Sequence, residues 1–442
     1  MPPIKVPKRL STALVTSFGA GVVPRVGLEY VAVGRKQEVA AVLQDLENVA
    51  EGGAAFRIIV GRFGSGKSFL LQLMRNHAME RGFVVADADL SPERRLSGTA
   101  GQAVGTYREL MRNLATKTRP DGGALPAILE KWISGVQAVV LSETGLSPMD
   151  PALLNKVEAK IFQAVNEMEG LVHGFDFAAV LSAYWRGHRQ DQPELKEAAL
   201  RWLRGEFATR TDARQALGTR VIIDDDTWYD YLKLLANFVS EIGYQGLLVV
   251  LDEAVNLYKI SNSISRQNNY EKLLAIFNDT MQGKAAHLGF LLGGTPQFLE
   301  DSNRGVFSYE ALRSRLAESR FSKPGLQDTS SPVLRLEMLT PEEIFVLLLR
   351  LLEIHAAHFG YEPRLTNNQI QAFLQVVHDR LGADALLTPR ETVRDFLYVL
   401  NILRQNPGTR FEDLIQGQDF QPTPAGADPD EAPSGPYAEF TI

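Results

Sequence analysis

The sequence predicts an α/β protein in which a parallel β-sheet has helices on both faces, with a large helical insertion and a C-terminal helical lid. Two observations predict this class. Five short apolar stretches have the pattern of buried strands, and segments with helical apolar spacing separate them. A glycine-rich loop joins the first of these strands directly to a helix. Because open parallel sheets bind ligands at the carboxyl ends of their strands, functional residues are expected at that edge.

The elements follow one another in a regular order. Helices are predicted over residues 35–48, from the glycine loop to about residue 81, and from about residue 341 to residue 406. The region between the second and third strands is expected to be mostly helical. The predicted strands are AFRIIVG (55–61), FVVADADL (83–90), GLLVVLDEA (246–254), LGFLLGGTP (288–296) and PVLRLEML (332–339).

Composition limits the class of protein. The 442 residues are too many for one simple core. No apolar run is long enough to span a bilayer and no signal-peptide core is present, so we expect a cytoplasmic location and no membrane partner. The absence of cysteine excludes disulfides and thiolate metal sites. A formal net charge of −7 argues against a broadly basic nucleic-acid coat and leaves room for a local basic channel.

The glycine loop fits the pattern G-x-x-x-x-G-K-[ST] and sits between a strand and a helix, which is the context that this motif requires. Its backbone N–H groups would cradle phosphates at a helix N-terminus. Lys67 would neutralise the β- and γ-phosphates, and the Ser68 hydroxyl would bind Mg²⁺. The predicted nucleotide-binding residues of the loop are Gly61, Arg62, Phe63, Gly64, Ser65, Gly66, Lys67, Ser68 and Phe69.

The third strand ends in two carboxylates, Asp252 and Glu253. Two carboxylates at the end of an apolar strand are costly unless a cation or a reacting water is their partner. We expect Asp252 to hold Mg²⁺ and Glu253 to polarise the water that attacks the γ-phosphate. The alternative is a helix N-terminus with two acids, which the helix dipole also favours. The pair indicates hydrolysis, because a small-molecule kinase does not need a water-activating glutamate.

Four further polar residues are candidates for sensing or for action on a neighbouring subunit. Thr295 ends the fourth strand and could contact the γ-phosphate or the water; a turn-forming Thr-Pro is the alternative. Arg313 or Arg315 could reach a neighbour's γ-phosphate, and the alternative is an exposed surface charge. Arg390, beside Pro389 at a first-turn position, could reach the nucleotide from the lid or be a solvated helix start.

Three weaker patterns have simpler explanations. His355 and His358 have a spacing that could bind metal, but no third ligand is visible, so packing or surface roles are favoured. Residues 224–226, three aspartates, are expected to cap a helix. Trp185, Trp202 and Trp228 lie in helical stretches and are expected in the core.

The order of these parts resembles the AAA+ ATPases among the P-loop NTPases, in particular their origin-recognition and cell-division-control branch. The stretch VAVGRKQE resembles the box that contacts adenine in these proteins, with Gly34 and Arg35 at matching positions. Over residues 20–405 the chain resembles the BrxD ATP-binding proteins of bacterial BREX phage-defence systems. The stretches that carry this resemblance are GVVPRVGLEYVAVGR, VGRFGSGKSFLL, VVADADLSPERRL, GVFSYEALRSRL and TPRETVRDFLYVLN.

The resemblance implies a cytoplasmic ATPase that uses ATP and Mg²⁺ and assembles with copies of itself when ATP binds. It also implies action on or near DNA, beside a helicase or other defence proteins. Arg390 matches the second-sensor position, and Thr295 stands where many relatives carry Asn. Two other classes of protein are alternatives. One is a scaffold that binds nucleotide with negligible turnover, and the other is a small-molecule kinase. No winged-helix pattern follows the lid, so a C-terminal DNA reader is not expected.

From these features we expect five parts. Residues 1–30, interrupted by Pro and Gly, would form an extended N-terminal arm. The insertion is longer than a compact AAA+ core needs, and part of it would belong to the core. The acidic tail has no Lys or Arg and is expected to be disordered or loosely docked. After the arm, the parts are the nucleotide-binding core (31–95 and 210–338), the insertion (96–209), the lid (339–414) and the tail (415–442).

Overall fold

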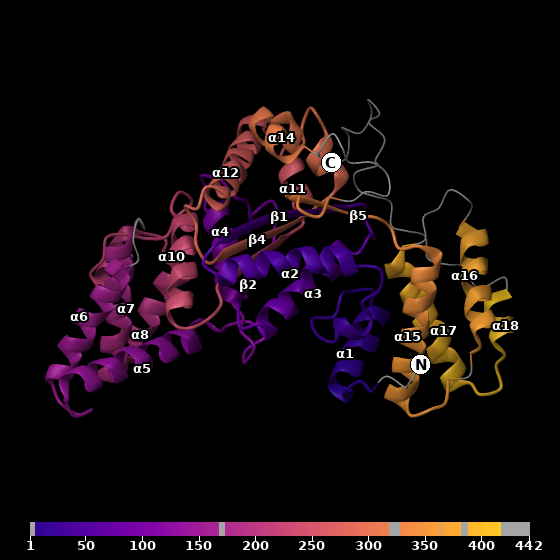
Figure 1. The fold of residues 1–442 in the computed structure, drawn as a ribbon, viewed down its shortest axis with the longest axis horizontal. Helices are drawn as coiled ribbons and strands as arrows, with labels where there is room; N and C mark the ends of the chain where they lie inside the picture. Colours follow the sequence, from indigo (N-terminus) through magenta and orange to yellow (C-terminus); the bar gives the residue numbers. More distant parts are fainter. Residues whose placement is uncertain (1–4, 168–172, 318–327, 364, 382–387, 417–442) are drawn as a thin grey trace.

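The computed structural model describes residues 5–167, 173–317, 328–363, 365–381 and 388–416. Its centre is a five-stranded parallel sheet with strand order β2-β3-β4-β1-β5 (Figure 1). All five predicted strands are present, which confirms the α/β prediction. They are β1 (Ala54–Gly61), β2 (Val84–Asp89), β3 (Leu247–Asp252), β4 (Leu288–Gly294) and β5 (Val333–Leu336).

Alternate residues of each strand bury on opposite faces of the sheet. On β1, Ala55 and Ile59 pack under α2 (Lys36–Ala50) and α3 (Lys67–Glu80). Phe56, Ile58 and Val60 face the other side, where α4, α10 and α12 lie. This period-2 alternation lets near-continuous apolar strands serve two helical layers. The bounds on that side are α4 (Gln102–Arg112), α10 (Trp228–Glu241) and α12 (Ser263–Met281).

The insertion forms a bundle beyond the β2 edge of the sheet, at the left of Figure 1. Its helices are α5 (Leu125–Thr144), α6 (Ala152–Glu167), α7 (Gly174–Arg189) and α8 (Pro193–Leu203). They are joined by α9 (Arg210–Leu217), which lies in the range predicted as core and packs against α8. Trp132 of α5 packs edge-on against Phe238 of α10 with ring centroids 4.8 Å apart. The prediction that Trp185, Trp202 and Trp228 are core residues is confirmed, because all three are fully buried.

Two of the three aspartates accept hydrogen bonds at the starts of helices, and the two helices are different. Asp224 accepts hydrogen bonds from the backbone N–H and the hydroxyl of Thr227, before α10. Asp225 instead accepts from the N–H groups of Gly101, Ala103 and Val104 and so caps α4, far away in the chain. Thus one carboxylate stabilises a helix that sequence distance could not indicate.

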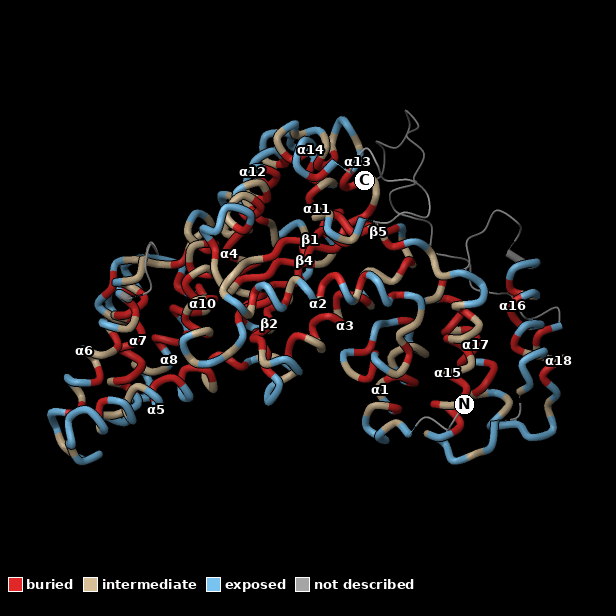
Figure 2. The backbone as a smooth tube through the Cα atoms, in the orientation of Figure 1, coloured by how far each residue is buried: buried red, intermediate tan, exposed pale blue. Residues whose placement is uncertain are grey.

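Short helices and the lid complete the chain. The short elements are α11 (Val255–Tyr258), α13 (Pro296–Glu300), η2 (Val306–Ser308) and α14 (Glu310–Leu316). The lid consists of α15 (Pro341–Phe359), α16 (Asn367–Leu381), α17 (Pro389–Gln405) and α18 (Phe411–Gln416). Its buried residues form a separate apolar cluster at the right of Figure 2. Within the described ranges, no helix is both long and apolar enough to cross a membrane.

The two lid histidines have packing roles. His355 is fully buried and its ring nitrogens contact Tyr361 Oη at 2.8 Å and Asn401 Oδ1 at 3.2 Å. His358 Nδ1 lies 2.9 Å from the hydroxyl of Ser11 in the N-terminal segment. The described part of the chain holds no cluster of three or more His, Cys, Asp or Glu side chains suited to a metal.

The expectation of an extended N-terminal arm is wrong for residues 8–19. They form helix α1 (Lys8–Gly19), followed by the 3₁₀ turn η1 (Leu28–Tyr30). The helix forms because Leu14 and Val15 bury in the lid's apolar cluster, so tertiary packing outweighs the flanking Pro and Gly residues. Pro7 stands at the N-cap of α1, where a missing N–H does no harm. The predicted tail lies outside the described residues from residue 417 onward.

Candidate nucleotide-binding site

The glycine loop joins β1 to α3 at the carboxyl edge of the sheet. Gly64 and Gly66 have φ values of +80° and +92°, which L-residues with side chains rarely adopt. A Cβ at Gly64 would also lie 2.8 Å from the Cβ of Thr388 in the lid. At Gly61 a Cβ would collide with the Ser65 hydroxyl. These positions therefore need glycine for backbone conformation, close approach, or both.

The charged end of the loop is held by hydrogen bonds within the site. Lys67 Nζ donates to the carbonyl oxygens of Gly61 at 2.8 Å and Arg62 at 3.0 Å. Ser68 Oγ donates to Asp252 Oδ2 at 2.5 Å, which joins the loop helix to the end of β3. The buried hydroxyl of Ser65 has no hydrogen-bond partner among the described residues. A buried orphan hydroxyl inside such a glycine loop fits a site built to receive further acceptors.

Three carboxylates gather at this edge. Asp89, at the end of β2, is the register partner of Asp252 on β3, and Glu253 follows. Burial, Asp252 and Asp89 raise the pKa of Glu253 in that order, against the opposing pull of Lys67 and Lys259. Burial and then Asp252 likewise raise the pKa of Asp89. The three carboxylates therefore repel one another, and a cation bound among them would relieve this repulsion.

Sequence reasoning missed Asp89. Its signal was available, because FVVADADL ends in an acid at the same parallel-strand edge as GLLVVLDEA. The strand also carries Asp87, and the sequence alone does not say which of the two reaches the edge. In the structure Asp89 lines the cavity, whereas Asp87 pairs with Arg75.

Glu253 has a strained backbone, with φ of +58°. Several bonds hold it there: its N–H donates to Asp252 Oδ1 at 2.8 Å, and Asn256 Nδ2 donates to its carbonyl at 3.2 Å. The same Asn256 amide donates to the carbonyl of Leu90, just after β2, at 2.8 Å. Asn256 therefore ties the ends of β2 and β3 together. A left-handed non-glycine residue that its surroundings hold in place is typical of functional sites.

The residues matching the adenine box have structural contacts. Arg35 is buried, and its Nη2 donates to the carbonyls of Ser65 at 2.8 Å and Glu337 at 2.6 Å. It thereby joins the glycine loop to the chain leading into the lid. Gly34 has φ of +70°, and a Cβ there would collide with the Glu343 carboxylate of α15. Arg35 lines the cavity, and Gly34 does not.

The sensor candidates separate into two groups. Thr295 and Arg390 line the same cavity as the glycine loop. Thr295 Oγ1 also accepts from the N–H of Phe298 at 3.2 Å, which makes it the N-cap of α13. Arg313 and Arg315 lie on α14, are exposed, and are not part of this cavity.

The cavity has a volume of about 450 Å³, and its lining is of two chemical kinds. Residues 63–69 of the glycine loop line it together with Asp89, Asp252 and Glu253. Apolar side chains line it as well: Phe18, Val22 and Val23 from the N-terminal segment, and Leu347 and Val393 of the lid. A lining that combines a glycine loop and charged groups with apolar side chains suits a nucleotide, whose base is apolar on its faces. Gly61 and Arg62 contribute their carbonyls to Lys67 and do not line the cavity.

Ser68 and Asp252 are suitable ligands for Mg²⁺. Both offer oxygen atoms, they are already in contact, and Mg²⁺ prefers one or two protein oxygens together with substrate phosphates and water. The mutual repulsion of Asp89, Asp252 and Glu253 fits the same cation.

The parallel sheet and the glycine loop between β1 and α3 define a P-loop type of nucleotide-binding protein. A family model described as "BREX system ATP-binding protein BrxC/D" matches residues 6–419, nearly the whole chain. The chain therefore belongs to this family of ATP-binding proteins, which confirms the resemblance to the BREX phage-defence proteins. Among curated proteins, no relative matches the chain.

Proposed function

We propose that this chain hydrolyses ATP to ADP and phosphate in the cavity between the sheet and the lid. The observation that carries the proposal is the arrangement at the ends of β1 and β3. Ser68 contacts Asp252 there. Glu253 follows with a strained backbone conformation that hydrogen bonds hold in place. In this proposal Lys67 neutralises the β- and γ-phosphates, and Ser68 and Asp252 hold Mg²⁺. When bound, Mg²⁺ would neutralise charge on the phosphate oxygens.

Glu253 is the proposed general base. Its carboxylate accepts a proton from the attacking water while the water oxygen bonds to the γ-phosphorus. The bond from that phosphorus to the β,γ-bridging oxygen breaks, and the oxygen leaves with ADP. The raised pKa of Glu253 supports this role, because it makes the carboxylate a stronger base than an ordinary one. Arg390 and Thr295, which line the cavity, would contact the γ-phosphate region.

Substitution of Glu253 by Gln tests the proposal. We expect ATP to bind with near-normal affinity, because Gln keeps the shape of the Glu253 side chain. Turnover should fall by about 10²-fold or more, because the amide cannot act as the general base. Turnover and calorimetric binding are measured on the same preparation, with Glu241→Gln, on the far end of α10, as the control. Unchanged turnover would rule out the assignment of Glu253.

The lysine provides a second, independent check of the same site. Lys67→Ala should lose nucleotide binding, because the phosphate charge then lacks its main neutralising partner. If the unchanged protein binds ATP without turnover, the chain is a nucleotide-held scaffold instead of a hydrolase.

We also propose that ATP promotes assembly of copies of this chain. The exposure of Arg313 and Arg315, away from their own cavity, supports a role at a neighbour's γ-phosphate. Light scattering should show a larger mass with ATP, and Arg313→Ala or Arg315→Ala should reduce ATP-dependent assembly or turnover. A monomer at every ATP concentration would contradict this part.

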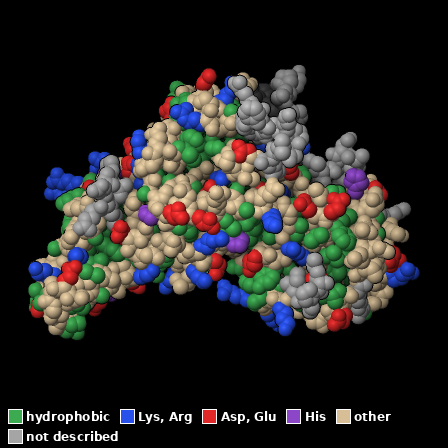
Figure 3. Space-filling view, viewed as in Figure 1, with side chains coloured by type: hydrophobic (Ala, Val, Ile, Leu, Met, Phe, Trp, Pro, Cys, Tyr) green, Lys and Arg blue, Asp and Glu red, His purple; other side chains and the backbone are tan. Residues whose placement is uncertain are grey.

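We further propose that the assembly acts on DNA-associated complexes in phage defence, with a helicase or other defence proteins as partners. Family membership supports the defence role. On the face shown in Figure 3, acidic and basic side chains are interspersed among the described residues. DNA contact would therefore use a local basic group or a surface formed in the assembly. Turnover measured with and without duplex DNA tests it, and equal rates would argue against DNA action.

A further inference from the structure

The N-terminal segment crosses from the lid to the sheet and forms part of the cavity on the way. On the lid side, α1 buries Leu14 and Val15 in the lid's apolar cluster. Residues 20–25, here called the wall segment, then pass along the cavity. Within it, Val22 and Val23 belong to the apolar part of the cavity lining and remain 52% and 37% exposed. Apolar side chains exposed inside a cavity indicate a surface that a ligand covers.

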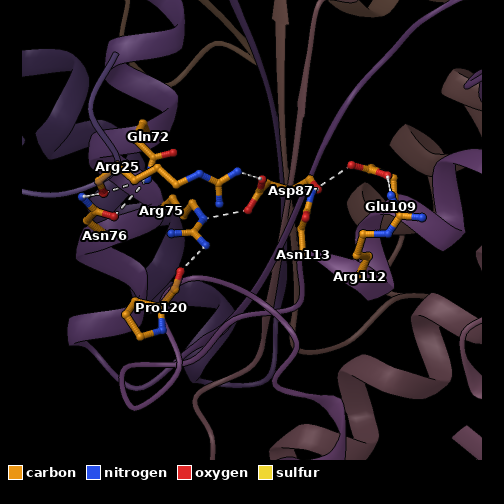
Figure 4. A network of polar contacts seen from close by, with 9 residues as sticks. All are labelled: Arg25, Gln72, Arg75, Asn76, Asp87, Glu109, Arg112, Asn113 and Pro120. Carbon is orange, nitrogen blue, oxygen red and sulfur yellow. Dashed lines mark hydrogen bonds and ion pairs between the residues drawn. The ribbon is translucent and has the colours of Figure 1, made fainter. Parts of the chain in front are cut away.

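On the sheet side, the wall segment is fastened at Arg25 (Figure 4). The Arg25 carbonyl accepts from Asn76 Nδ2 at 2.9 Å and from Gln72 Nε2 at 3.2 Å, both on α3. The Arg25 guanidinium lies 3.8 Å from Asp87 Oδ2 on β2. Backbone and side chain of one residue thus contact both the helix that follows the glycine loop and the strand beside β3.

The acceptor on the sheet is itself fixed. Asp87 Oδ1 accepts from Nε of Arg75 at 2.7 Å, and Arg75 Nη2 donates to the carbonyl of Pro120 at 2.7 Å. Arg75 is only 2% exposed, so its charge depends on Asp87 and cannot turn to water instead. The second carboxylate oxygen of Asp87 is left to face Arg25, as Figure 4 shows.

The wall segment has no regular secondary structure, so its position depends on contacts such as those of Arg25. Gly21 within it and Gly27 just after it have φ values of +70° and +81°, and glycine loses much conformational entropy when it is ordered. Without the fastening, the binding-competent position of Val22 and Val23 would be populated only part of the time. The apparent dissociation constant of a ligand equals its intrinsic value divided by that fraction, so it rises as the fraction falls.

We propose that the Arg25–Asp87–Arg75 network positions the wall segment against the nucleoside half of the bound nucleotide. Arg25 is a positioning residue in this proposal, since it acts through Val22 and Val23. The inference rests on nucleotide binding in the proposed function and does not depend on hydrolysis. The network is expected to affect binding of the nucleoside half alone. The glycine loop, which is proposed to bind the phosphates, keeps its own hydrogen bonds when Arg25 is replaced.

The test compares ATP with inorganic triphosphate, both with Mg²⁺, by calorimetric titration of the full chain. Arg25→Ala should weaken ATP binding about two- to fivefold, as expected for loss of a half-exposed ion pair. Arg25→Ala combined with Asn76→Ala should weaken it about tenfold, because a backbone fastening is lost as well. Inorganic triphosphate has no nucleoside for the wall to touch, so its affinity should change by less than about twofold. Arg25→Lys should restore part of the ATP affinity.

The matched control is Arg112→Ala. This arginine lies at the far end of the same group of residues and pairs with Glu109, and its side chain is 74% exposed. Equal ATP affinity in Arg25→Ala and Arg112→Ala would overturn the inference, as would equal weakening of ATP and triphosphate. Thermal unfolding without nucleotide shows whether the variants are folded. If the unchanged chain binds no ATP, the proposed function fails together with this inference; if it binds ATP without turnover, only the hydrolysis proposal fails.

Discussion

The insertion and the lid are both helical, but they are attached to the sheet in different ways. Trp132 of the insertion packs on Phe238 of α10, and Tyr229 of α10 packs on Phe290 of β4 with ring centroids 6.2 Å apart. One apolar cluster therefore runs from the insertion into the sheet. The lid has its own cluster, shared with α1, and meets the glycine loop through Thr388 beside Gly64.

This difference indicates which region can move. Separating the insertion from the sheet would expose apolar surface, at a cost of about 25 cal/mol per Å². The seam between lid and sheet contains glycine contacts, bonds such as Arg35 to Glu337, the wall segment, and Phe69 of α3, which is only partly buried against the lid's apolar cluster. The cavity lies in this seam. We therefore expect the lid to respond to nucleotide and the insertion to act as a fixed extension of the sheet.

The largest effect is expected from Trp202→Ala, which tests whether the insertion and the sheet share one apolar core. Trp202 of α8 packs edge-on against Tyr231 of α10 and donates to the carbonyl of Val221 at 2.7 Å. Removing this buried side chain should cost about 3–5 kcal/mol of unfolding free energy. Hydrogen exchange should rise in the insertion and in the sheet-side helix α10 together. Faster exchange in the insertion alone would mean that it is not continuous with the core.

Phe373→Ala makes the corresponding change in the lid. Phe373 of α16 is fully buried against Phe396 of α17, with ring centroids 5.3 Å apart. We expect a local cost of about 3 kcal/mol, confined to the lid and α1, because their cluster is separate from that of the sheet. Hydrogen exchange in β1, β3 and β4 should stay at its original rate. Equal loosening of these strands would show that lid and sheet unfold as one unit.

The smallest effect is expected from Asp89→Asn, which changes a charge at the sheet side of the cavity. Asp89 is one of the charges that raise the pKa of Glu253, so its removal should lower that pKa. Glu253 would then stay ionised to lower pH, and the acid limb of kcat/KM for ATP should move downward. Measuring kcat/KM for ATP from about pH 5 to pH 8 shows the direction of this shift. Asp121→Asn, at an exposed position, is the control. A limb that stays in place or moves upward would contradict the electrostatic account.

The strands and the glycine loop between β1 and α3 could be predicted because their signals are short and continuous. GRFGSGKS between an apolar strand and a helix contains nearly everything that the loop conformation needs. The helix α1 was missed because its stability comes from the lid, which lies hundreds of residues further along the chain. Asp89 was missed because an acid in a strand has meaning only beside Asp252 on the neighbouring strand.

Local patterns in the chain were therefore enough to define the class of fold, the glycine loop after β1 and the acids that end β3, since each depends on neighbours a few residues away. The fold was needed to pair Arg25 with Asp87, Arg35 with the carbonyl of Glu337, and Asp225 with the start of α4. These partners are distant in the sequence, and a polar side chain acquires its role only when packing brings a particular partner within reach. Apolar periodicity specifies which face is buried, but it does not specify which polar groups meet at the edges.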